Sequence, residues 1–179
     1  MATNRRSAGL LLFRILGQGR PVEVLLGHMG GPFWQARDAG AWSVPKGEYA
    51  PEEEPMAAAR REFEEELGLA PPDGPWLALG EVRQSGGKTV TVWAVEGELD
   101  TALVVPGTFT MEWPRGSGRM REFPEIDRAE WIGVEEAGEK LVKGQRVFLD
   151  RLAELLASGA SGASGASGAS DAPDVSGAG

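Results

Sequence analysis

The feature that most constrains the fold is a short, strongly acidic helix between stretches typical of β-strands. Residues 61 to 69 read REFEEELGL, and the helical pattern runs from about Pro55 to Leu67, with Gly68 as its stop. Apolar runs rich in branched residues precede it (LLLFRIL and VEVLLGH), and further runs follow it (WLALGEVRQ and KTVTVWAV). The sequence therefore predicts a mixed α/β plan, with strands before and after the helix.

The remaining elements follow from the same patterns. WSVP is predicted as a short strand, SGG as the turn of a hairpin, TFTMEW as an alternating strand and AEWIGV as the last strand. Helices are predicted at about 134–143 and 145–157. From residue 158 the chain has no large apolar residue, so we expect one domain over 1–157 and a disordered Gly/Ala/Ser-rich tail over 158–179.

Composition excludes several classes of partner. The net charge of −9 argues against binding to nucleic acid or to an anionic membrane, because both need a basic surface. There is no cysteine, so neither a disulfide nor a thiolate metal site is available. The N-terminal run MATNRRSAGLLLFRIL is interrupted by Arg14 and lacks a small-residue cleavage site, so we interpret it as a first strand of a cytoplasmic protein.

Three carboxylates share one arc of the acidic helix. At about 100° per residue, Glu62, Glu65 and Glu66 lie together, beside an apolar arc that contains Phe63, while Glu64 points to solvent. Like charges at these spacings repel by roughly 0.2–0.5 kcal/mol per pair, so the arc needs a positive partner. Such a set of oxygen ligands suits a hard divalent cation, and we predict Mg²⁺, with Mn²⁺ as a substitute.

The residues upstream complete a known motif. Gly47, Glu53 and Arg61 precede the acids at fixed spacings, and Gly68 follows them. Residues 47–69 thereby reproduce every constrained position of the Nudix box, and the chain resembles the Nudix hydrolase family.

The resemblance implies an α/β fold, an α/β/α sandwich with a central mixed β-sheet. In relatives the three helix acids bind magnesium at a diphosphate, often joined by the carbonyl before the motif glycine, which here belongs to Lys46. Glu53 and Arg61 are expected to pair and hold the loop on the helix. Gly47 is expected to supply a backbone turn that a side chain would obstruct.

The reaction implied is hydrolysis of a phosphoanhydride by metal-activated water. Glu62 or Glu65 is the first choice for the proton acceptor, and the later loop RMREFPEID offers Glu122 and Glu125 as alternatives. Lys46 is either an exposed lysine or a phosphate contact. Trp34 and Arg119 are candidate substrate contacts, although each has a structural alternative as a loop anchor or a solvated basic residue.

Two functions are consistent with these residues. The first is a Mg²⁺-dependent pyrophosphohydrolase, with a nucleoside triphosphate or a dinucleoside polyphosphate as the substrate type. The second is a noncatalytic Nudix-fold sensor that binds a nucleotide. Because sensors of this kind usually lose acids from the box and this chain retains them, we favour the enzyme. A homodimer is a further expectation, because many relatives pair.

Overall fold

The structure is a computed structural model that describes residues 5–17, 19, 21–84 and 86–163. The strands are β1 (Arg6–Ile15), β2 (Val22–Met29), β3 (Trp42–Ser43), β4 (Lys46–Glu48), β5 (Trp76–Arg83), β6 (Thr89–Glu96), β7 (Thr108–Glu112), β8 (Met120–Pro124) and β9 (Ile126–Gly133). The α-helices are α1 (Pro55–Leu67), α2 (Val134–Lys140) and α3 (Val147–Ala163), and short 3₁₀ turns occur at Thr101–Leu103 and Lys143–Gln145.

Seven of these strands form one mixed sheet. Its order is β3-β2-β1-β6-β5, with β4 paired to β1 and β9 paired to β2. β1 and β6 run parallel, and the other pairs are antiparallel. The predicted mixed sheet is therefore confirmed.

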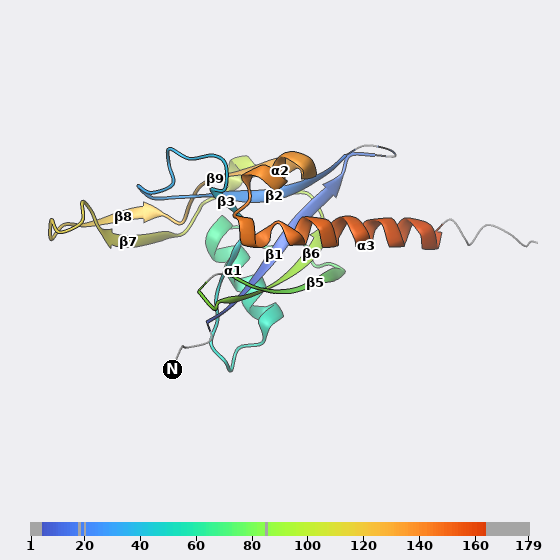
Figure 1. The fold of residues 1–179 in the computed structure, drawn as a ribbon, viewed down its shortest axis with the longest axis horizontal. Coiled ribbons are helices and arrows are strands. Elements are labelled where there is room, and N and C mark those ends of the chain that lie inside the picture. Colours follow the sequence, from blue (N-terminus) through green and yellow to red (C-terminus); the bar gives the residue numbers. More distant parts are fainter. Residues whose placement is uncertain (1–4, 18, 20, 85, 164–179) are drawn as a thin grey trace, which may run out of the picture.

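Strand β1 lies at the centre because its apolar run has two buried faces. Leu10 and Leu12 pack toward α1, whereas Leu11 and Phe13 pack toward α2 and α3. All four side chains are almost completely buried. A strand buried on both faces has a continuous apolar run instead of an alternating one, which is what GLLLF provides. Helices cover both sides of the sheet, as the predicted sandwich requires (Figure 1).

The two halves of β1 have different neighbours on the same side. Its first residues pair with β4, so that Ala8 lies opposite Gly47, whereas its last residues pair with β2. Helix α1 packs on β1 and β4. Because β2 and β4 pair with different parts of β1, the backbone of Lys46 and Gly47 is free to face the acidic arc of α1.

The second sheet differs from what the sequence predicts. β7 and β8 form a two-stranded antiparallel hairpin that projects from the body of the fold (Figure 1). We predicted the strand at β7 but a loop where β8 lies. Residues 120–124 show little apolar periodicity because the strand is mostly exposed, and it pairs with β7 in a two-stranded sheet.

The C-terminal helices also differ from the prediction. α2 ends at Lys140, three residues early, and α3 extends to Ala163, past the expected boundary at residue 157. Residues 164–179 of the predicted tail lie outside the described residues, as does Ser85 of the predicted SGG turn. Within the part of the chain that the structure describes, no helix is long and apolar enough to cross a membrane.

Strand β5 forms one edge of the sheet and is interrupted by a bulge. The pairing register shifts between Ala78 and Gly80, and Gly80 adopts a φ of 77° that favours glycine. Arg151 of α3 donates hydrogen bonds to the carbonyls of Leu79 (2.8 Å) and Glu81 (3.1 Å). The helix thereby satisfies two backbone acceptors of this edge strand.

A buried glutamine fixes the segment that leads into β4. Gln145 is 1% exposed; its Oε1 accepts from the Val44 N–H (2.9 Å) and its Nε2 donates to Ser43 Oγ (3.0 Å). The link between β3 and β4 therefore has its polar backbone satisfied by a residue about a hundred positions later.

We predict that Gln145→Leu lowers the free energy of unfolding by about 1–3 kcal/mol, because the Val44 N–H is left buried without an acceptor. Urea denaturation followed by tryptophan fluorescence measures the change. A matched Gln84→Leu substitution, outside this network, is expected to have little effect. Equal stability of Gln145→Leu and the wild type would contradict the role of this side chain.

Candidate active site

The acidic arc of α1 packs directly against the backbone of β4. A Cβ at residue 47 would overlap the carboxylate of Glu62, so a larger residue would displace this carboxylate from β4. Gly47 lies in strand β4 and has no positive φ. The predicted backbone turn at Gly47 is therefore wrong, and the missing Cβ instead leaves room for the Glu62 carboxylate.

Arg61 holds the acids and the preceding loop together. Its Nε and Nη2 donate to the two carboxylate oxygens of Glu53 at 2.9 and 3.0 Å, which confirms the predicted pair. Its Nη1 donates to Glu62 (2.6 Å) and to Glu65 (3.1 Å). The hydrogen bonds with Glu53 are the main reason that the pKa of Arg61 is raised, and they lower the pKa of Glu53.

Glu66 and Lys46 form the inner part of the site. The Lys46 N–H donates to Glu66 Oε2 at 3.3 Å. Burial raises the pKa of Glu66 to about 8, against the favourable charge of the nearby Lys46. Burial also lowers the pKa of Lys46, while Glu66, Glu62 and Glu125 act to raise it. Lys46 is half-buried and faces the acids, so the interpretation as an ordinary exposed lysine is wrong.

Glu125 joins the acids of α1 from the link between β8 and β9. The Gly107 N–H donates to the Glu65 carbonyl and the Glu125 N–H to the Gly107 carbonyl, so residue 107 bridges the two segments. Partial burial and the charge of Glu65 raise the pKa of Glu125. Of the two candidates on the later loop, Glu125 thus lies in the field of the acids. Glu122 is exposed on β8 opposite Thr110.

Burial also raises the pKa of Glu62, and the hydrogen bond from Arg61 opposes this effect. Glu65 is the outermost of the three, with a side chain that is 56% exposed. Glu64 is exposed, as predicted, and its carbonyl accepts from the Gly68 N–H at the end of the helix. Gly68 has the left-handed φ of 69° expected of the helix stop.

The donor set suits a hard cation. Four carboxylates (Glu62, Glu65, Glu66 and Glu125) lie near the basic side chains of Arg61 and Lys46. Among the residues that the structure describes, no three acidic or histidine side chains stand in ready-made metal geometry. The Nη1 of Arg61 engages an oxygen of both Glu62 and Glu65. The oxygen chemistry matches Mg²⁺, which takes few ligands from protein.

Two further predicted contacts lie apart from this cluster. Trp34 is half-buried and packs against the core beneath α2 and α3, with the Arg37 guanidinium 5.6 Å from its ring. Arg119 lies just past the turn of the projecting hairpin, where its carbonyl accepts from the Trp113 N–H. Phe33, beside Trp34, is the exposed ring of this loop, at 46%, and contacts the edge of Trp113 at 5.3 Å. Their roles with a substrate stay predictions.

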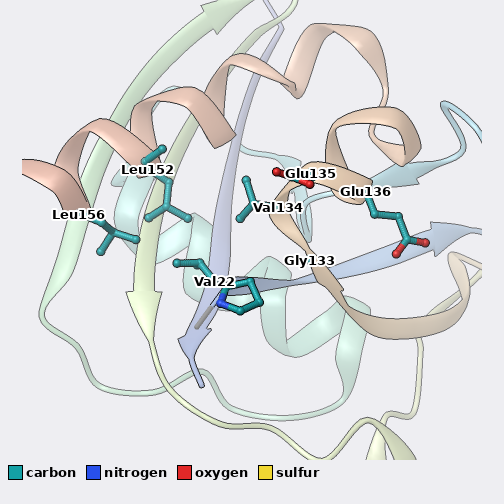
Figure 2. Close-up of a pocket in the computed structure, with 9 residues that line it drawn as sticks. Val22, Gly133, Val134, Glu135, Glu136, Leu152 and Leu156 are labelled. Carbon is teal, nitrogen blue, oxygen red and sulfur yellow. The ribbon is translucent and has the colours of Figure 1, made fainter. Parts of the chain in front are cut away.

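A separate pocket of about 480 Å³ lies on the other face of the sheet. Figure 2 shows Leu152 and Leu156 of α3 facing Val22 and Val134 across it. Its lining is mainly aliphatic, and its two carboxylates, Glu135 and Glu136, belong to the first turn of α2. Although apolar pockets often bind ligands, chemistry on a polar bond needs converging charged groups, and these lie at α1.

Comparisons with known proteins agree with this geometry. A sequence profile described as the NUDIX domain matches residues 3–152. An Ap4A hydrolase from C. elegans, solved as a binary complex, has a TM-score of 0.60 at 21% identity, over 85% of this chain and 98% of its own. A mutT/nudix family protein from Listeria innocua has a TM-score of 0.59 at 17% identity, over 89% and 98%.

The NUDIX domain of Shewanella oneidensis NrtR, solved with ADP ribose, has a TM-score of 0.57 at 14% identity, over 87% of this chain and 90% of its own. At these identities the solved structures establish the fold alone. A search of curated proteins finds no match to the sequence.

The raised pKa of Glu66 predicts a pH-dependent cost of keeping this carboxylate charged. The pKa rises from the usual 4.5 to about 8, so the folded state binds the proton more tightly than the unfolded chain. The free energy of unfolding should therefore fall as pH rises from about 4.5 to about 8. Glu66→Gln removes this loss. We expect the free energy of unfolding of the variant, relative to that of the wild type, to increase by about 1–4 kcal/mol between pH 5 and pH 9.

Urea denaturation at both pH values, with a chelator present, measures this gain. The control is Glu64→Gln, which removes the same charge from the exposed side of α1. A difference between the Glu66→Gln variant and the wild type that does not change with pH would contradict the buried environment of Glu66.

Proposed function

This chain belongs to the Nudix hydrolase family, and we propose that it hydrolyses a nucleoside diphosphate linked to a further group, with Mg²⁺ as the cofactor. The observation that carries the proposal is the packing of the acidic arc of α1 onto the glycine backbone of β4. Glu62 and Glu66 each contact β4 there, at Gly47 and at the Lys46 N–H respectively. This arrangement concentrates negative charge where a metal-bridged diphosphate would neutralise it.

Glu62, Glu65 and Glu66 would hold the cation, together with the carbonyl of Lys46. When bound, the cation supplies charge neutralisation at the phosphates and acidifies the attacking water. Arg61 orients two of the three carboxylates through Nη1 and is itself fixed by Glu53. Arg61 and Glu53 therefore act on the position of the site and not on the reacting atoms.

The proton of the attacking water needs a carboxylate acceptor. Glu62 or Glu65 is our first choice, and Glu125 is the alternative from the β8–β9 link. Burial raises the pKa of both Glu62 and Glu125, which brings each closer to the neutral range where a general base works best. The ammonium of Lys46 faces the same carboxylates, and we assign it a contact with substrate phosphate.

The type of substrate is a further part of the proposal. We propose a nucleoside triphosphate or a dinucleoside polyphosphate, with the exposed ring of Phe33 and the neighbouring Trp34 as candidates for contact with the base. Relatives of similar fold include an Ap4A hydrolase and a domain bound to ADP ribose. A cytoplasmic location, a homodimer and the absence of nucleic-acid binding remain predictions from the sequence.

We predict that Glu65→Gln lowers kcat by about 100-fold or more, because it removes a carboxylate that holds the cation or takes the proton. Release of phosphate products by the Mg²⁺-loaded protein is the measurement. The matched control is Glu64→Gln, on the next residue of the same helix but facing solvent, which should stay within about twofold of the wild type.

Titration calorimetry with Mg²⁺, and separately with Mn²⁺, completes this test. Heat of binding is expected for the wild type and Glu64→Gln, and weaker binding for Glu65→Gln. A fully active Glu65→Gln variant would remove this arc from the mechanism. Nucleotide binding without turnover by the wild type would favour the alternative of a noncatalytic sensor.

A panel of dGTP, Ap4A and ADP ribose in H₂¹⁸O identifies the bond that is cut. We expect at least one compound to be hydrolysed within its phosphoanhydride, with ¹⁸O entering one phosphate product. Pyrophosphate with a monophosphate marks a triphosphate substrate, and two nucleotides mark a dinucleoside substrate. Release of inorganic phosphate alone from the chain end would contradict the proposal.

A further inference from the structure

The only histidine in the sequence is buried between two hydrogen-bond acceptors. His28, near the end of β2, has 0% of its surface exposed. Its Nδ1 lies 2.7 Å from Asp127 Oδ1, and its Nε2 lies 2.6 Å from the backbone carbonyl oxygen of Arg37. The ring edge also packs on Trp42, with centroids 5.1 Å apart.

These partners determine which ring nitrogens carry protons. A carbonyl oxygen only accepts, so Nε2 must donate. Asp127 has the Arg128 guanidinium 3.6 Å from the same Oδ1, which favours the ionised carboxylate, and a carboxylate also only accepts. Nδ1 must donate as well. The ring is therefore an imidazolium whose charge is balanced by Asp127.

The surrounding charges leave Asp127 as the counter-ion. Asp38, on the same loop as Arg37, is instead engaged by Lys140 of α2 at 2.7 Å and by the Trp42 indole N–H at 2.9 Å. Arg128 of β9 and Lys140 each lie over Trp42, at 5.0 and 5.2 Å. Arg37 contributes its carbonyl, while its guanidinium lies toward Trp34.

The two acceptors belong to segments that flank the candidate active site. Arg37 lies in the connection between β2 and β3, residues 30–41, which also carries Phe33 and Trp34. Asp127 lies two residues after Glu125, whose carbonyl accepts from the Gly30 N–H at 2.9 Å. An imidazolium between Asp127 and Arg37 thus ties the aromatic loop to the strand that begins beside Glu125.

We propose that His28 is a positioning residue for substrate binding: as an imidazolium it holds the aromatic loop against β9, in the position that presents Phe33 to the substrate. The proposal rests on the proposed function. Loss of the ring leaves both acceptors without this donor, so the loop is held less firmly against β9. The acids of α1 are anchored separately by Arg61 and by β4, so the loss affects KM more than kcat.

The ring itself is the first test, and it needs no substrate. Because the chain has one histidine, the imidazole ¹⁵N resonances of labelled, tag-free protein belong to His28 alone. In the assay buffer both nitrogens are expected to show attached protons, because each faces an acceptor. A bare Nδ1 or Nε2 overturns the proposal. This result stands whether or not the protein turns over nucleotides.

Kinetics provide the second test. His28→Gln and Asp127→Asn are each expected to raise KM about tenfold for the panel compound that the wild type hydrolyses fastest, the size of one lost charge-assisted hydrogen bond. Their kcat should stay within about twofold. The control is Asp73→Asn, which removes a carboxylate that is fully exposed.

Two outcomes overturn the positioning role: an unchanged KM in both variants, or a fall in kcat at constant KM. If His28→Gln does not fold, the KM of Asp127→Asn and the ring resonances of the wild type still test the proposal. A wild type without hydrolytic activity would remove the proposed function, and the positioning role with it, whereas the resonances would report the protonation of His28 regardless.

Discussion

The whole site depends on one steric condition, the absence of a side chain at residue 47. Because Gly47 has no Cβ, the Glu62 carboxylate can lie on the β4 backbone, and Glu66 reaches the Lys46 N–H beside it. This closeness removes water from both carboxylates, which raises their pKa values. Arg61 opposes part of this cost at Glu62. The fold therefore maintains an electrostatically unfavourable arrangement that a divalent cation would relieve.

The acids on α1 lie close together in the sequence. The segments that position them come from distant parts of the chain. β1 aligns β4 under the helix, and a link more than forty residues after the helix brings Glu125 beside Glu65. The aromatic loop then joins β9 through His28 and through the Gly30 N–H. Each of these connections is a hydrogen bond or a strand pairing between distant segments, so a change far from the acids can still alter their geometry.

Sequence reasoning succeeded where periodicity or a fixed spacing carries the information. The helix wheel located the shared face of Glu62, Glu65 and Glu66, and the motif paired Arg61 with Glu53. It failed where position depends on tertiary contacts. β8 has no buried face to create a pattern, and the depth of Lys46 arises from its neighbours. The charge on His28 follows from two acceptors, one of them a backbone carbonyl, that no local pattern reveals.

The guanidinium of Arg151 has a consequence beyond the satisfaction of two carbonyls. An open sheet margin is a template on which another polypeptide can add by intermolecular backbone pairing. At the β5 bulge the acceptors are already occupied by a cation from α3, and the bulge disturbs the regular spacing that an incoming segment would need. The same contact that docks the last helix thus protects this side of the molecule from polymerisation through its strands.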